Sequence, residues 1–471
     1  MTINKQVFQG VLWSIIQNWG SQAGSFIVFL ILARLLTPQD FGLLSLANIF
    51  LAFMNIFLEQ GFTSALIQRK KLDSEHLDTA FCTQVITGIF LTFISFFLAK
   101  NIALFFNQPR LTVIIQCFSF LFIINSFGHI FQAVLQRDLN FKILAVRSLI
   151  AIIISGFLAI IFALLGFGVW SLVIQQFTYE SGIVIVMWNA IDWRPKLKFS
   201  YAHFQDLFNF SIYIFFTQFL MFFYIKSDNL LIGYFLGEIA LGYYAIAYRI
   251  LEVMTQLLIG VINQVAFPTF SKIQTDITLL RQTFLQAIQF TSLIAFPAFF
   301  GLLALTPEII ITLFGKQWTP SILVLRILIF SGILSSFFSC MGAVFLTLGK
   351  SYLQFYLTLL TIILSVTLAC FLIKWGITAV AFAFVFSSYL IFPFALWMLT
   401  KLISITLKQY LQQFITPLIS SVIMILAIVL VKYFFAMYLN TIILLIICII
   451  VASLTYIISI LQIKAISSKQ N

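Results

Sequence analysis

The chain has 471 residues, of which 62% are hydrophobic and only 8% are charged, and its net charge is +12. A soluble domain carries about 25% charged residues, so this composition excludes a soluble globular protein. The apolar surface must face lipid, which predicts an integral membrane protein.

Fourteen apolar runs approach or exceed the length of about 20 residues that a membrane-spanning helix needs. Their hydrophobicity is continuous rather than alternating, which excludes an outer-membrane barrel. We expect an all-α polytopic protein whose first span is not cleaved, since the first run is too long for a signal peptide. In chain order, the runs are Gly10–Leu36, Phe41–Ile67, Ala80–Ala99, Leu111–Leu135, Leu149–Leu165, Val169–Ala190, Leu207–Leu236, Ile239–Ala266, Phe284–Leu305, Ile322–Leu346, Leu353–Ile373, Ile377–Leu399, Ile415–Val431 and Leu439–Leu461.

The turn after the first run has a counterpart near mid-chain. RLLTPQDFGLLSLA at Arg34–Ala47 and YFLGEIALGYYAIA at Tyr234–Ala247 align without a shift at an offset of 200 residues, which places Gly42 on Gly242. A membrane chain that repeats at half length is typical of a transporter made of two similar bundles. Chance similarity between two apolar hairpins is the alternative.

The basic and polar segment Ile191–Asp206 predicts a linker between two lobes of six helices each. We expect an N-terminal lobe at 1–200, a C-terminal lobe at 201–400, and an additional helix pair with a cytoplasmic tail at 401–471. Six spans is an even number, so the two lobes have the same orientation, as in a parallel pseudo-repeat. Within the first span, Gly20 and Gly24 form a small-residue face that predicts close helix packing.

The basic residues concentrate in alternate loops, as at Arg69–Lys71 and Arg194–Lys198, whereas the intervening loops hold few. This asymmetry is the positive-inside pattern of a membrane protein. It predicts that both termini are cytoplasmic, and it explains the positive charge without a nucleic-acid partner.

Ionisable side chains inside spans cost about 2.5–3.5 kcal/mol on insertion scales and so indicate function. Arg249 and Glu252, three residues apart, are expected to form an internal ion pair. Lys226 and Arg326 can instead extend to the membrane surface. Glu59 and Glu180 have no basic residue within one turn, so each is a candidate proton carrier unless it lies at a solvated span end. The full set is Arg34, Glu59, Glu180, Lys226, Asp228, Arg249, Glu252 and Arg326.

No metal or cofactor motif accompanies these charges. The five cysteines are scattered in apolar runs without a CxxC pair, and neither HExxH nor GxxxxGK[ST] occurs. The densest ionisable segment, Asp73–Asp78, is interpreted as a solvated polar loop. We therefore expect neither a catalytic site nor a bound metal or cofactor.

An ordered series of segments resembles the polysaccharide and lipopolysaccharide (O-antigen-type) exporter family of the multidrug/oligosaccharidyl-lipid/polysaccharide (MOP) superfamily. The resemblance extends from about Val7 to Leu399. The segments are ILARLLTPQDFGLLSLA (Ile31–Ala47), GFTSALIQRK (Gly61–Lys70), VLQRDLNFK (Val134–Lys142), GVWSLVIQ (Gly168–Gln175), DNLLIGYFLGEIALGYYAIAYRI (Asp228–Ile250), FPTFSKIQ (Phe267–Gln274) and LFGKQWTPSILVLRIL (Leu313–Leu328).

The resemblance implies a flippase of the bacterial inner membrane with two six-helix lobes around a central cavity. Its cargo would be an undecaprenyl-pyrophosphate-linked oligosaccharide, moved from the cytoplasmic to the periplasmic leaflet. Candidate residues for the pyrophosphate or acidic sugars are Arg34, Lys226, Arg249 and Arg326. Candidate acids for coupling to a proton or sodium gradient are Glu59, Glu180, Asp228 and Glu252. A polysaccharide polymerase and glycosyltransferases are the partners expected in the same process.

Two related activities stay open, a multidrug or toxin extruder of the same superfamily and the lipid II flippase of peptidoglycan synthesis. A basic cavity favours the glycan exporter, and a cavity dominated by carboxylates favours the extruder. A membrane-bound glycan polymerase is disfavoured because it normally needs a large loop outside the membrane, and the loops here are short.

Overall fold

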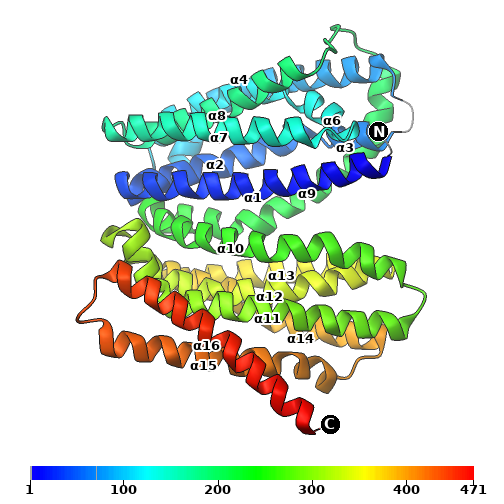
Figure 1. The fold of residues 1–471 in the computed structure, drawn as a ribbon. Coiled ribbons are helices and arrows are strands. Elements are labelled where there is room, and N and C mark those ends of the chain that lie inside the picture. The colour runs from blue at the N-terminus through cyan, green and yellow to red at the C-terminus, as the bar shows by residue number, and fades with distance from the viewer. Residues whose placement is uncertain (1–2, 70–71, 471) are drawn as a thin grey trace. The chain divides into compact units, whose positions relative to one another are not determined.

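In the computed structural model, which describes residues 3–69 and 72–470, the regular structure is entirely helical. This confirms the all-α prediction (Figure 1). The helices are α1 Ile3–Leu35, α2 Pro38–Glu59, α3 Phe62–Gln68, α4 Ser74–Phe105, α5 Leu111–Ser126, α6 His129–Arg137, α7 Phe141–Leu164, α8 Val169–Ala190, α9 Tyr201–Phe235, α10 Gly237–Lys272, α11 Ile277–Ile309, α12 Ser321–Thr347, α13 Ser351–Leu372, α14 Ile377–Ile403, α15 Leu407–Phe435 and α16 Thr441–Gln470.

Among the described residues, 11 helices are long and apolar enough to cross a membrane. The number rises to 12 if the two segments of α9, which meet at 46°, form one span. The helix α8 matches its expected run but is less apolar, since it carries Gln175, Gln176 and Glu180. The structure thus shows a polytopic membrane protein.

One expected run is interrupted. The run Phe41–Ile67 breaks after α2, because Gln60 and Gly61 adopt left-handed backbone angles, with φ of 46° and 76°. The run Leu111–Leu135 instead holds together as one candidate span, Leu111–Arg137, although α5 and α6 are separated by Phe127 and Gly128. Runs of apolar residues do not reveal such breaks, because one or two residues set them.

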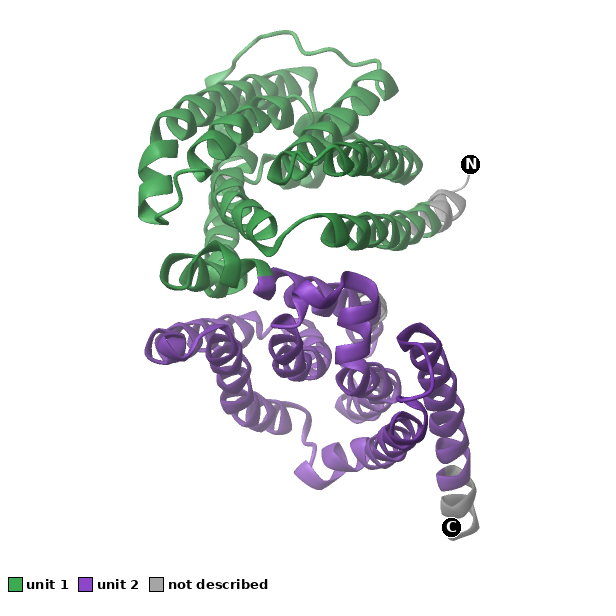
Figure 2. Ribbon diagram, turned by 90° about the vertical axis from the view of Figure 1, so that its left-hand side faces the viewer, with its two compact units in different colours: residues 1–242 green, residues 243–471 purple. Residues whose placement is uncertain are grey.

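The contacts divide the chain into two compact units, residues 1–242 and 243–471, shown in separate colours in Figure 2. In the first, α7 packs on α1 and α8, α4 packs on α5, and α2 packs on α9. In the second, α11 packs on α12 and α15, α13 packs on α14, and α15 packs on α16. The lobe boundaries expected at residues 200 and 400 are based on the sequence repeat, whereas the two compact units are defined by contacts. The expected boundaries therefore stay a prediction.

The contact between α1 and α7 shows how the helices of the first unit associate. Gly20 and Gly24 of α1 face Leu149 and Ile152 of α7, and Gly156 of α7 packs tightly against Val28. Large apolar side chains turn outward, as at Phe157, which is 65% exposed. Small residues inside and large ones outside are typical of helices packed in lipid. The close contact predicted for Gly20 and Gly24 is confirmed.

The two repeated turns of the sequence pack against each other within the first unit. A Cβ atom on Gly42 would overlap the backbone carbonyl of Glu238, and one on Gly242 would overlap the carbonyl of Pro38. At an offset of 200 residues, Pro38 corresponds to Glu238 and Gly42 corresponds to Gly242. The glycine of each turn therefore contacts the equivalent residue of the other turn. Only glycine allows the backbones to come this close.

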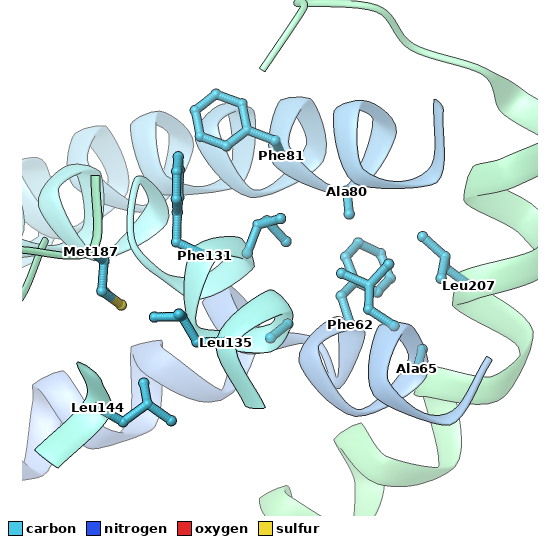
Figure 3. Close-up of a cluster of buried hydrophobic side chains, with 12 residues drawn as sticks. Phe62, Ala65, Ala80, Phe81, Phe131, Leu135, Leu144, Met187 and Leu207 are labelled. Carbon is cyan, nitrogen blue, oxygen red and sulfur yellow. The ribbon is translucent and has the colours of Figure 1, made fainter. Parts of the chain in front are cut away.

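A buried apolar cluster joins α3, α4, α6, α7, α8 and α9 at one end of the first unit (Figure 3). The cluster includes Phe62 and Ala65 of α3, Ala80 of α4 and Leu207 of α9, and Phe131 and Leu135 of α6 also belong to it. This cluster fixes the N-terminal ends of α4 and α9 together.

The interpretation of Asp73–Asp78 as a solvated loop holds for Asp73 and Glu75, which are exposed, but it is wrong for the end of the segment, residues 76–78. The helix α4 begins at Ser74, and both His76 and Asp78 are buried. The connection before α9 covers them: the amide of Lys196 donates to Asp78, and the amide of Ser200 donates to Thr79. The many charged residues predicted an exposed segment, but the connection before α9, which is distant in sequence, supplies hydrogen-bond partners for it.

The close glycine contact predicts a large penalty for any side chain at Gly42. We expect Gly42→Ala to destabilise the protein by about 1–3 kcal/mol, because its Cβ would force two backbones apart. The measurement is the thermal unfolding midpoint of the detergent-purified protein. Gly182→Ala is the matched control, since its Cβ would meet Ala151 Cβ at an ordinary 3.6 Å. Equal midpoints for the two variants would contradict the prediction.

Candidate functional site

A polar pocket opens beside the C-terminal end of α2. Glu59 is the last residue of that helix, and the left-handed turn at Gln60 and Gly61 redirects the chain into α3. The pocket has a volume of about 180 Å³. Its lining residues come from α2, α3, the turn between them, and α9: Ala52, Asn55, Ile56, Glu59, Gly61, Thr63, Ser64, Ile214, Phe215 and Gln218.

The pocket combines one carboxylate with several neutral hydrogen-bonding groups. Glu59 is exposed, and the carbonyl oxygen of the Asn55 side chain is buried without a partner among the described residues. Thr63, Ser64 and Gln218 add hydroxyl and amide groups. Such a set can bind hydroxyl-rich or cationic ligands, and an unpaired acceptor leaves capacity for one more donor.

Aromatic side chains form one wall of this region. The rings of Phe57 on α2 and Phe215 on α9 lie 5.3 Å apart between centroids. Phe53 contacts Phe219 at 6.0 Å and Phe222 at 5.3 Å. These contacts hold α2 against α9, so the position of Glu59 is fixed by packing as well as by its own helix.

A second polar group lies inside the first unit and centres on Arg147. Arg147 lies in α7 and is only 5% exposed. It donates to Gln132 of α6 at 3.1 Å and to the sulfur of Met187 on α8. A buried guanidinium needs such partners because burial without them is costly.

Glu180 belongs to this second group. It interacts electrostatically with Arg147 and accepts a hydrogen bond of 2.9 Å from Gln176. No basic residue lies within one turn of Glu180 in its own helix. The structure instead supplies Arg147 from α7, a partner that helix spacing could not reveal.

Three further predicted residues lie in the first unit. Arg34, one residue before the end of α1, is exposed, and Lys226 is half-buried in α9. Asp228 is 5% exposed and accepts a hydrogen bond of 2.7 Å from the amide of Asn229.

In the second unit, the predicted ion pair between Arg249 and Glu252 is confirmed, with 2.7 Å between Nη1 and Oε2. Gln256 donates to the second oxygen of Glu252 at 3.4 Å. Arg326 is half-buried in α12. Sequence reasoning missed a further ion pair at 2.6 Å, between Lys432 of α15 and Glu308 of α11. Its two residues are more than 120 positions apart, so no local spacing signals it.

Comparison with known proteins identifies the family. A family model described as "Polysaccharide biosynthesis protein" matches residues 31–323. The chain belongs to this family. The teichuronic acid biosynthesis protein TuaB of Bacillus subtilis is 26% identical over 420 residues, covering 88% of this chain and 87% of TuaB. The succinoglycan biosynthesis transport protein ExoT of Rhizobium meliloti is 29% identical, covering 71% of this chain and 68% of ExoT.

Solved structures of the MOP superfamily share the fold of this polysaccharide biosynthesis protein. The lipid II flippase MurJ in an inward closed conformation aligns with a TM-score of 0.78 at 16% identity, covering 95% of this chain and 98% of MurJ. An inward-facing multidrug transporter of the MATE family aligns with a TM-score of 0.65 at 17% identity, covering 81% and 94%. The chain is therefore a polytopic membrane protein of the polysaccharide biosynthesis family, with the fold of MurJ and of the MATE transporter.

The ion pair between Lys432 and Glu308 predicts a measurable coupling. Lys432→Met leaves the largely buried carboxylate of Glu308 without its cation, at a cost on the order of 2 kcal/mol because Lys432 itself is partly exposed. The double variant Lys432→Met/Glu308→Gln should recover most of the loss, since no isolated charge remains. Thermal unfolding of the three variants checks this, and additive losses in the double variant would exclude the coupling.

Proposed function

We propose that the protein moves an undecaprenyl-pyrophosphate-linked oligosaccharide from the cytoplasmic to the periplasmic leaflet of the bacterial inner membrane. The observation that carries this proposal is the family match over residues 31–323, in a chain whose relatives include a transport protein of polysaccharide synthesis. The transported unit would supply surface polysaccharide or lipopolysaccharide assembly. Its partners in the same process would be a polymerase and glycosyltransferases.

The physical problem is the passage of a glycan and a pyrophosphate through hydrocarbon. A protein solves it by offering polar and cationic groups along a hydrated path while the lipid tail stays in the bilayer. We assign pyrophosphate or acidic-sugar binding to Arg34, Lys226, Arg249 and Arg326. The three guanidinium groups can bind phosphate oxygens in pairs, and the ammonium of Lys226 adds a compact positive charge. Arg34 is accessible, and Glu252 orients Arg249.

The acids assigned to ion coupling are Glu59, Glu180, Asp228 and Glu252. The geometry favours two of them in different ways. Glu59 lies in a pocket with neutral polar neighbours, where a proton or sodium ion can enter. Glu180 lies beside Arg147, where a change in its charge would alter a buried network.

The finer architecture of the proposal is fourteen spans, with two six-helix lobes in parallel pseudo-repeat, an additional C-terminal pair and cytoplasmic termini. The reciprocal contacts of Gly42 and Gly242 support a two-fold relation between the repeated turns. Alternating access would then proceed by rocking of one lobe against the other.

The likeness to a MATE transporter favours multidrug extrusion as the second candidate, and the likeness to MurJ favours lipid II transport as a third. The three functions differ in cargo rather than in fold, so a cellular phenotype distinguishes them.

Deletion of the gene provides that phenotype. The proposal predicts loss of a surface polysaccharide with viability retained, measured by gel electrophoresis and staining of the extracted glycan. Unchanged glycan with greater drug sensitivity would instead establish the extruder, and a lethal deletion with halted peptidoglycan synthesis would establish the lipid II flippase.

The role of Arg249 is tested in the deletion strain. Arg249→Ala should abolish glycan display at normal protein abundance, and Arg249→Lys should restore only part of it, because an ammonium lacks the paired geometry of guanidinium. Gln256→Ala is the control, because it removes a neighbouring hydrogen bond to Glu252 but keeps the guanidinium of Arg249. Full display by Arg249→Ala would remove this residue from the binding site.

A further inference from the structure

Three side chains from distant parts of the sequence form a compact cluster where α4 and α9 begin. Asp73 precedes α4 as its N-cap residue, His76 lies in the first turn of α4, and His203 lies in the first turn of α9. Each offers a metal-binding atom within 4.8 Å of one on each of the other two. The two imidazole rings meet edge to face, with centroids 4.1 Å apart.

The ring of His76 points to a ligand. Its side chain is only 7% exposed, and its Nδ1 has no hydrogen-bond partner among the residues that the structure describes. The other nitrogen, Nε2, accepts a hydrogen bond from Arg69, since a guanidinium can only donate. The neutral ring therefore carries its proton on Nδ1, where nothing accepts it. The nearest acidic oxygen, on Asp73, is 3.9 Å away and too far for a hydrogen bond.

The charges around the rings suit a divalent cation. Glu75 lies 4.0 Å from His203, and Asp206 lies 3.9 Å from His76. With Asp73, these residues supply three carboxylates, against the single guanidinium of Arg69, which pairs with Asp206. The balance over these four side chains is two negative charges.

We propose that Asp73, His76 and His203 bind a zinc ion, with water in the fourth position. Two imidazoles and one carboxylate are a common donor set for zinc. Ligand atoms at about 2.1 Å from a tetrahedral ion lie roughly 3.4 Å apart, so side-chain rotations close the gap from 4.8 Å. Asp73 is exposed and free to make the largest adjustment.

Proton balance follows from the two nitrogens of His76. When zinc binds Nδ1, the proton of the neutral ring moves to Nε2. The nearest oxygen of Asp206 lies 3.9 Å from Nε2, so Asp206 would have to move closer to accept a hydrogen bond from it. Arg69 keeps its ion pair with Asp206 and releases Nε2. The ring stays neutral, and Asp206 orients it as an outer carboxylate does in many zinc sites.

The consequence of zinc binding is mechanical. The connection before α9 already attaches to α4 through Lys196 and Ser200, and Ser200 also contacts Nδ1 of His203 at 2.7 Å. A zinc ion would add a direct link between α4 and α9, two helices that the apolar cluster of Figure 3 also joins.

The experiment uses the full chain, purified with an affinity tag other than polyhistidine. The protein is stripped with EDTA, incubated with zinc chloride and desalted, and its zinc is measured by mass spectrometry. We expect one zinc ion per chain in the wild type, and visible absorption bands of tetrahedral geometry when cobalt replaces zinc. His203→Ala and Asp73→Asn should each lower zinc affinity at least tenfold.

Asp138→Asn, which removes an exposed carboxylate elsewhere in the same unit, is the control and should bind zinc normally. Size-exclusion chromatography establishes whether each variant is folded. If His203→Ala does not fold, Asp73→Asn still tests the site. Wild type without zinc, or folded variants that retain the wild-type amount, would overturn the proposal.

Discussion

Hydrocarbon offers no hydrogen-bond partners, and this constraint governs the whole structure. Backbone groups satisfy one another within helices, which accounts for the all-helical regular structure of the described residues. Buried charges follow the same rule. Arg147 bonds to Gln132 and Met187, and Lys432 bonds to Glu308. Each of these polar contacts joins two helices. Because a buried charge is costly without its partner, the contact also fixes the positions of the two helices.

Lipid also removes much of the hydrophobic drive for helices to associate, so close packing must replace it. Small residues provide that packing at Gly20, Gly24 and Gly156, between α1 and α7. The packing is closest at Gly42 and Gly242, where the backbone of one turn contacts the backbone of the other. The two copies of the repeated turn therefore stabilise each other by direct contact.

Two polar features of the first unit lie where helices break or begin. The left-handed turn at Gln60 and Gly61 ends α2, exposes Glu59 and creates the pocket beside it. The start of α4 gathers His76 and its acidic neighbours under the connection to α9. Such ends interrupt the apolar helix surface, and so they admit groups that bind ions and sugars.

The sequence by itself determined the membrane environment, the helical class, the family resemblance and the ion pair of Arg249 with Glu252. These depend on composition, run length and spacing within one helix, all of which are local. Only the tertiary structure decided that Arg147 is buried, that His76 faces His203, and that Glu180 has a basic neighbour. In each case the partner comes from another helix, and its proximity exists only once the helices have packed.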